Sequence, residues 1–181
     1  MNHTQRLLTA GSLVLALAGC SGDLGKTDTG GVRLSLSSFD QLPIYVSASA
    51  DCCDLVVPTM TLENVALEPS GTTSDLMNVE LQSYEVVYTR EDTGTRVPPK
   101  LVQTIFGIVP VNGTNTLTDY PIIKHDQFNN QPFLDLQNLG RDSETGSTVV
   151  RMRLTMRFFG RTLAGKAVDS TPASFSIEVR P

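Results

Sequence analysis

The chain contains no tryptophan, and its 181 residues include only four tyrosines and seven phenylalanines. Ligand sites are often lined by aromatic rings, so this composition argues against a carbohydrate site built on stacked indoles. Of the two histidines, only His125 lies beyond the first few residues, beside Asp126 in a turn-like segment. No Gly-x-Ser-x-Gly elbow, phosphate-binding glycine loop or helical zinc motif accompanies it. We therefore expect a protein that is not an enzyme and that carries no metal or cofactor.

Basic residues are also in the minority, with 14 Lys and Arg against 19 Asp and Glu and a formal net charge of −5. An acidic balance makes nucleic acid and anionic membrane surfaces poor partners. The triplet Asp-Thr-Gly occurs at residues 28–30 and 92–94 and matches the short sequence motif of aspartic proteases. In that family an apolar strand precedes the triplet, whereas here Lys26-Thr27 and Arg90-Glu91 do. Because Asp and Gly favour turns, we interpret the second triplet as a turn and the first as part of a tether.

The first 19 residues have the three parts of an export signal. Arg6 supplies the basic start, Leu7 to Leu17 form the apolar centre, and small residues follow. A helix that spans a bilayer needs about 20 apolar residues. This run is shorter and is diluted by polar residues, so we predict a signal peptide over residues 1–19 rather than a membrane span.

The signal ends in Leu17-Ala18-Gly19-Cys20, which resembles the lipobox of bacterial lipoproteins. The resemblance implies cleavage before Cys20, attachment of diacylglycerol to its sulfur, and acylation of the new amino terminus with a fatty acid such as palmitate. Because Ser21 rather than Asp follows the cysteine, the same resemblance favours sorting to the outer membrane, on its periplasmic or its surface side. The alternative is an ordinary secretory signal with a cysteine near its cleavage site.

Residues 20–31 contain a single sizeable apolar residue, Leu24. Such a segment cannot bury enough surface to offset the entropy of ordering it, so we predict a lipidated cysteine followed by a flexible tether. Residues 32–181 are long enough to form one domain with its own core.

The clearest periodicity in this domain runs from Val150 to Phe158, where apolar residues alternate with Arg or Thr. A period of two indicates a half-buried strand. Similar alternation appears near residues 32–37, 84–89 and 174–179, and a mostly apolar run spans 101–109. The strand near 174–179 is predicted to pair antiparallel with the one at 150–158. A slip in apolar parity before Tyr84 predicts a β-bulge near Ser83.

Seven to nine short strands separated by turn residues predict an all-β domain, an antiparallel sandwich of immunoglobulin or fibronectin type III style. A jelly roll or other Greek-key barrel is the alternative. Residues 83–89 and 158–168 are similar to strands of uncharacterised fibronectin-like domains found in bacterial lipoproteins. Those domains usually carry Asn where this chain has Lys166. The resemblance implies a fold and no activity.

Cys52 and Cys53 are adjacent in the motif Asp51-Cys52-Cys53-Asp54. In an oxidising compartment they are expected to be oxidised, either to each other in a strained vicinal disulfide or to other thiols. Free thiols or a metal site with His125 remain further options, although zinc sites usually use spaced cysteine pairs.

The outward parity of the strand at 150–158 places Arg151, Arg153 and Arg157 on one face. Two interpretations are open. The row is a solvent face whose cross-strand partners are acids such as Glu178, or it is a surface that binds an anion or a protein partner.

The sequence is consistent with two functions. The first is a lipid-anchored, non-enzymatic envelope protein whose sandwich presents loops to another envelope protein. The second is an accessory lipoprotein that binds a small molecule or a carbohydrate. Fold alone does not decide between them.

Overall fold

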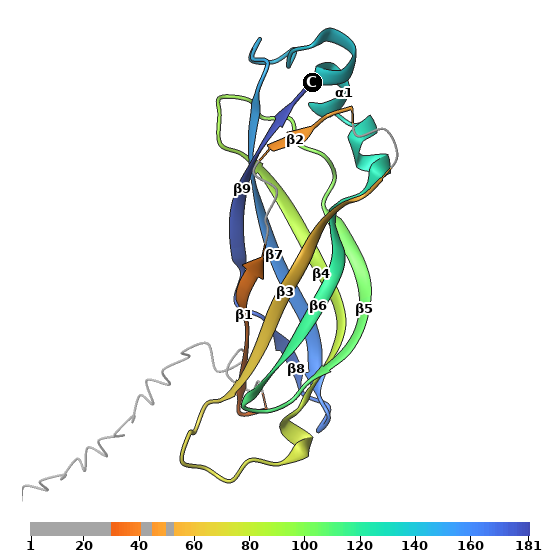
Figure 1. The fold of residues 1–181 in the computed structure, drawn as a ribbon. Helices are drawn as coiled ribbons and strands as arrows, with labels where there is room; N and C mark the ends of the chain where they lie inside the picture. Colours follow the sequence, from red (N-terminus) through yellow and green to blue (C-terminus); the bar gives the residue numbers. More distant parts are fainter. Residues whose placement is uncertain (1–29, 41–44, 50–52) are drawn as a thin grey trace, which may run out of the picture.

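The computed structural model describes residues 30–40, 45–49 and 53–181. This part of the chain is mostly β, with nine strands, one α-helix and short 3-10 turns (Figure 1). The strands are β1 (Val32–Asp40), β2 (Tyr45–Ser47), β3 (Leu55–Ala66), β4 (Val79–Arg90), β5 (Leu101–Val109), β6 (Gly113–Ile123), β7 (Val150–Thr162), β8 (Ala167–Asp169) and β9 (Ala173–Arg180). The helical elements are η2 (Asp75–Met77), η3 (His125–Asn129) and α1 (Phe133–Leu139).

The strands form two sheets that share one core. One sheet has the order β1-β3-β6, and the other has the order β2-β9-β7-β4-β5, with β8 paired to β7. Tyr84 joins the two sheets, because its ring stacks on Phe158 within its own sheet and contacts Tyr120 of the other edge-on. Its hydroxyl donates to the carbonyl oxygen of Pro121 at 2.8 Å. The core is therefore a layer between two sheets, as predicted for an all-β domain.

β7 follows the predicted alternation. Every apolar residue of that parity from Val150 to Phe158 is buried. β9 pairs antiparallel with β7 as predicted, and Arg151 lies opposite Glu178. The predicted bulge is also present, since the register of β4 shifts between Leu81 and Ser83 against both of its neighbours.

Between β5 and β6 the chain turns from one sheet to the other. Asn112 adopts a left-handed φ of 54°, and its side chain accepts from the amide of Ala66 at 3.0 Å. Asn64 of β3 is buried and donates to the carbonyl oxygens of Met77 and Val109, both at 3.1 Å. Where the chain changes sheet, some backbone groups lose their strand partners. The side chains of these two asparagines take the place of those partners and so hold the turn between β5 and β6.

The helix α1 is present in the structure but is not predicted from the sequence pattern. It has only two turns, and Phe133 and Leu136 are its buried apolar residues. Gly140 ends it with a φ of 67°, the left-handed conformation that glycine adopts without strain. Two turns are too short for a sustained period of 3.6 residues, which is why the pattern does not reveal it.

Candidate functional site

A network of hydrogen bonds and ion pairs lies at the end of the domain opposite Gly30. We call this the loop end and define it as residues 91–99 and 124–149, which include η3 and α1 (Figure 1). It contains the connection from β4 to β5 within the larger sheet and the connection from β6 to β7, which passes from the smaller sheet to the larger one. Loops held on a sheet scaffold are where binding residues commonly occur.

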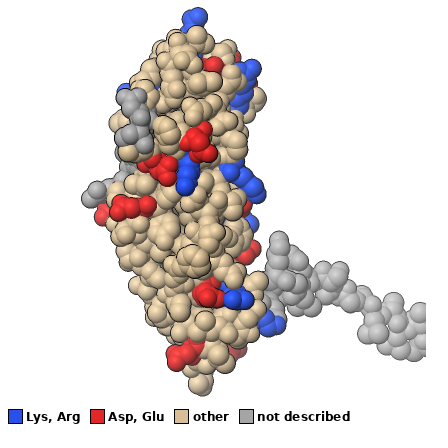
Figure 2. Space-filling view, turned by 90° about the vertical axis from the view of Figure 1, so that its right-hand side faces the viewer, with Lys and Arg blue, Asp and Glu red and all other residues tan. Residues whose placement is uncertain are grey.

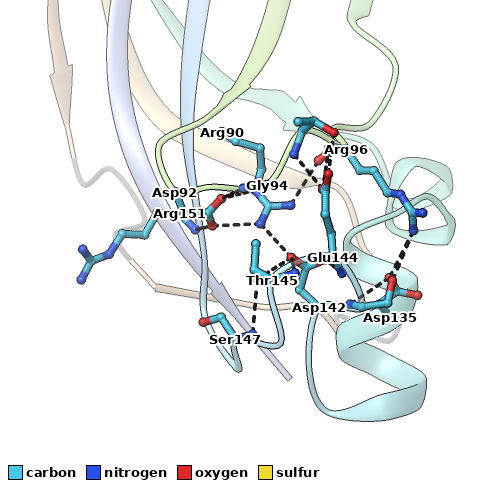
Figure 3. Close-up of polar contacts among 12 residues, drawn as sticks. Arg90, Asp92, Gly94, Arg96, Asp135, Asp142, Glu144, Thr145, Ser147 and Arg151 are labelled. Carbon is cyan, nitrogen blue, oxygen red and sulfur yellow. Dashed lines mark hydrogen bonds and ion pairs between the residues drawn. The ribbon is translucent and has the colours of Figure 1, made fainter.

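Arg90, the last residue of β4, holds these loops together (Figure 3). Its side chain is 3% exposed and forms a paired contact with Asp92, Nε to Oδ1 at 2.7 Å and Nη2 to Oδ2 at 2.9 Å. Nη2 also donates to Oδ2 of Asp142 at 2.9 Å, 52 residues later in the chain. Nη1 donates to the carbonyl oxygen of Arg96 at 3.3 Å. One buried guanidinium therefore joins the loop after β4 to the loop before β7.

Asp142 is fully buried and is also held by its own loop. Its Oδ2 accepts from the hydroxyl of Thr145 at 2.7 Å and from the amide of that residue at 3.2 Å. The neighbouring Glu144 reaches the other loop, where its carboxylate accepts from the amides of Thr95 at 2.7 Å and Arg96 at 3.0 Å. The loop after β4 and the loop before β7 are thus joined twice, once through Arg90 and Asp142 and once through Glu144.

A second set of contacts connects these loops to α1. Arg96 donates to Oε1 of Gln131 at 2.7 Å and to the hydroxyl of Ser143 at 3.2 Å. The Ser143 hydroxyl donates in turn to Asp135, the buried acid in the first turn of α1. The helix is therefore part of the same polar network.

The charges in this network stabilise one another. Burial alone would lower the pKa of Arg90, but the hydrogen bonds that it donates to Asp92 and Asp142 raise it overall. Burial would raise the pKa of both carboxyls, yet for Asp142 the hydrogen bonds from Thr145 and Arg90 bring the pKa below its ordinary value. The pKa of Asp92 is lowered in the same way, chiefly by Arg90. All three groups are charged at neutral pH.

Gly94 packs directly against the Arg90 side chain. A Cβ at this position would lie 2.4 Å from both Cζ and Nη2 of Arg90. Its amide also donates to Oδ1 of Asp92 at 3.0 Å. The triplet at residues 92–94 therefore forms a turn, as predicted, and the turn is shaped around the buried guanidinium.

This arrangement joins the loops of this end rigidly to one another. Arg90 and Asp142 are enclosed and hydrogen-bonded, so neither is presented to a substrate. His125 is exposed at the start of η3, and its amide donates to Asp54 at 2.9 Å. In the described ranges, no three His, Cys, Asp or Glu side chains gather as metal ligands would.

The arginine row lies on the outer face of the larger sheet. Arg151 pairs with Glu178 at 3.1 Å, as predicted, and Arg153 pairs with Glu91 at 2.7 Å. Arg157 lies opposite Glu85 in the register of β4 and β7. Exposed pairs of this kind contribute about 0–1 kcal/mol each. The acids therefore neutralise much of the row, as expected for a solvent face.

The cysteines fall mostly outside the described residues. This applies to Cys20, the predicted lipidation site, and to Cys52. Cys53 is described and is disulfide-bonded.

An apolar stripe runs along β5, which is the edge strand of the larger sheet. Phe106 is 84% exposed, and Val102 and Ile108 are also exposed. Asn115 of β6 donates to the carbonyl oxygen of Ile108 at 2.9 Å and so covers part of the edge. The side of the molecule that carries β5 shows acidic and basic residues scattered among broad uncharged areas (Figure 2). This stripe is a second exposed apolar feature of the domain.

One signal in the sequence points to the buried arginine. Arg90 has the same parity in its strand as Tyr84 and Tyr88, whose side chains are buried. Strand alternation alone therefore directs Arg90 inward. No sequence signal indicated its partner Asp142, because that residue is distant in the chain.

No protein-family model matches this chain, and no curated protein or solved structure matches it. Within the described ranges, no helix has the length and apolar character needed to cross a bilayer.

Proposed function

We propose that this protein is a lipid-anchored, non-enzymatic component of the bacterial envelope, attached to the outer membrane. Acylated Cys20 holds it to the bilayer, and its domain presents the loop end to another envelope protein. We further propose that the domain is a sandwich of the immunoglobulin or fibronectin type III kind.

The strand order supports this fold assignment. In such sandwiches the first, second and fifth strands share one sheet, and the third, sixth and seventh share the other, which a further strand can extend beside the third. Here β1, β3 and β6 share one sheet, and β4, β7 and β9 share the other, with β5 beside β4. The short β2 pairs parallel with β9, so the start of the chain contributes to both sheets.

The functional proposal rests on one observation: the described chain begins at one end of the domain, and the loop end lies at the other. The described domain begins at Gly30, next to the loop that follows β3, where the amide of Leu67 donates to the carbonyl oxygen of Gly31 at 2.9 Å. The loop end, braced by Arg90, lies at the far end (Figure 1). A tether at one end and rigid loops at the other suit a protein that displays those loops away from a membrane.

The tyrosines give little support to the carbohydrate-binding alternative. Tyr84 and Tyr88 are buried, and the ring of the exposed Tyr45 has the guanidinium of Arg180 4.5 Å from its centre. The hollow of about 390 Å³ beside the start of β5 is lined by residues such as Lys100, Lys124 and Gln127, none of them aromatic. None of these three tyrosines lines that hollow, so it offers no tyrosine ring on which a sugar could stack.

Two experiments test the proposal. Radiolabelled palmitate should enter the parent protein but not a Cys20→Ser variant, and that variant should leave the membrane fraction. If the label does not enter the parent, or if both proteins fractionate alike, the anchor is refuted.

Crosslinking in intact cells then tests the role of the loop end. Leu139 and Arg141 are exposed there, so a Leu139→Asp, Arg141→Glu variant should lose crosslinks that the parent forms. An Arg161→Glu variant on the outer sheet face is the matched control and should keep them. Equal crosslinking by all three proteins would contradict the role of the loop end.

A further inference from the structure

Three large apolar side chains are exposed at the end of the domain where the described chain begins. They come from three separate segments: Leu67 after β3, Leu76 in η2 and Leu163 in the turn between β7 and β8, with exposed fractions of 54%, 58% and 45%. We call them the anchor-end leucines. About half of each leucine is left uncovered by the domain, and this exposed apolar surface is free to contact another apolar phase.

Backbone hydrogen bonds bring two of these segments together. The amide of Leu163 donates to the carbonyl oxygen of Asn78 at 2.9 Å, and the amide of Ala164 donates to that of Leu76 at 3.0 Å. The turn after β7 is therefore fixed beside η2. These two leucines cannot separate without breaking both hydrogen bonds.

The third segment lies where the chain enters. Leu67 is hydrogen-bonded to Gly31, and a Cβ on Gly31 would lie 3.4 Å from Cε of Met77, the residue after Leu76. A hollow of about 340 Å³ is lined by Gly31, Leu67 and Met77 among others. The anchor-end leucines thus surround the point where the segment that carries Cys20 joins the domain.

The length of that segment limits how far this end can move from the anchor. Ten residues, 21–30, lead from Cys20 to the start of the described domain. Fully extended they span at most about 36 Å, and as a random coil their end-to-end distance is about 16–19 Å. Any lipid on Cys20 therefore keeps this end of the domain, rather than the loop end, near the bilayer surface.

We propose that the anchor-end leucines insert into the interfacial region of the bilayer that holds Cys20. This inference rests on the lipid anchor proposed above. Insertion would do more than a flexible tether can, because it orients the domain with its loop end pointing away from the membrane. Side chains that bury at the boundary of headgroups and acyl chains add to the binding supplied by acylation.

The charges near these leucines identify the kind of lipid surface. One exposed base, Lys166, lies in the turn that carries Leu163, and two exposed acids, Glu68 and Asp75, flank Leu67 and Leu76 in the sequence. Anionic lipids would repel them, because basic segments are what such lipids attract. The structure therefore fits a zwitterionic surface, contacted through apolar side chains.

The absence of tryptophan makes a direct test practicable. Leu76→Trp and Leu163→Trp each introduce a single indole into the acylated full-length protein, reconstituted into phosphatidylcholine vesicles. Leu139→Trp is the matched control, since Leu139 is 60% exposed at the loop end. We expect the first two emission spectra to shift to shorter wavelength on reconstitution and to be quenched by lipids brominated in their acyl chains. The control should show neither effect.

Each other outcome has a distinct meaning. If the protein floats with the vesicles but all three indoles behave alike, the insertion is refuted and the anchor stands. If the parent protein does not float with vesicles, the anchor fails and this inference fails with it. A blue shift of the Leu76→Trp protein at high concentration without vesicles would indicate contact with a second copy and would also overturn the insertion.

Discussion

Replacing Arg90 with methionine is the sharpest test of the network at the loop end. Methionine keeps most of the apolar length of the arginine side chain but removes the guanidinium. The change leaves Asp142 buried without its cation, while Asp92 can turn toward solvent because its side chain is 21% exposed. The main consequence is thus one unpaired buried carboxylate.

The cost follows from the burial of the pair. Removing one partner of a buried ion pair destabilises a protein by about 3–5 kcal/mol. Asp142 keeps its hydrogen bonds from Thr145, so we expect the lower end, about 3 kcal/mol. For a domain of this size, that loss lowers the melting temperature by about 6–12 °C.

Urea unfolding followed by circular dichroism measures this loss. The control is Arg161→Met, the same substitution on the outer face of the same sheet, where the pair with Glu80 is about half exposed on both sides. It should cost no more than about 1 kcal/mol. Adding Asp142→Asn to Arg90→Met should restore about 1–2 kcal/mol, because the orphan charge disappears. If the free energy of unfolding falls equally in Arg90→Met and Arg161→Met, the reasoning about the buried pair is wrong.

Three further predictions use the same unfolding assay. Gly94→Ala should cost about 1–3 kcal/mol in the parent, because its Cβ would overlap the Arg90 guanidinium, and clearly less in Arg90→Met; equal costs in the two backgrounds would contradict the packing. Tyr88→Phe should cost about 1–3 kcal/mol, because the buried hydroxyl donates to Ile122 at 2.7 Å and contacts Gln127 at 3.1 Å, and a neutral effect would show that water replaces it. The lowered pKa of Asp142 means that its stabilisation is complete above about pH 4 and is lost as the pH falls through the lowered folded value. Acid should therefore destabilise the parent more steeply than Asp142→Asn, and parallel pH profiles would refute the assignment.

Much of the fold was readable from alternation in the sequence. The parity of the residues from Val150 to Phe158 predicted which side of β7 is buried, and the slip before Tyr84 predicted the bulge. These features are local, because a side chain in a strand points to one face or the other according to its position. The short helix α1 was not readable, since two turns held by contacts with η3 leave too little periodicity.

The candidate site was only partly predictable, for the same reason. The position of Arg90 in its strand directs it inward, and the turn at residues 92–94 follows from Asp and Gly. The partnership with Asp142 joins residues 52 positions apart, and nothing in either local sequence records it. A pairing of this kind exists only after the sheets have brought the two loops to the same end.

The sequence by itself determined the acidic charge, the β-rich class, the parity of the strands and the predicted site of lipidation, all of which depend on composition or on neighbouring residues. Only the tertiary structure decided the order of strands in each sheet, the buried ion pairs at the loop end, and the gathering of three leucines where the described chain begins. Those depend on contacts between distant segments, and the free energy that selects one set of contacts comes from burying both sheets against a common core.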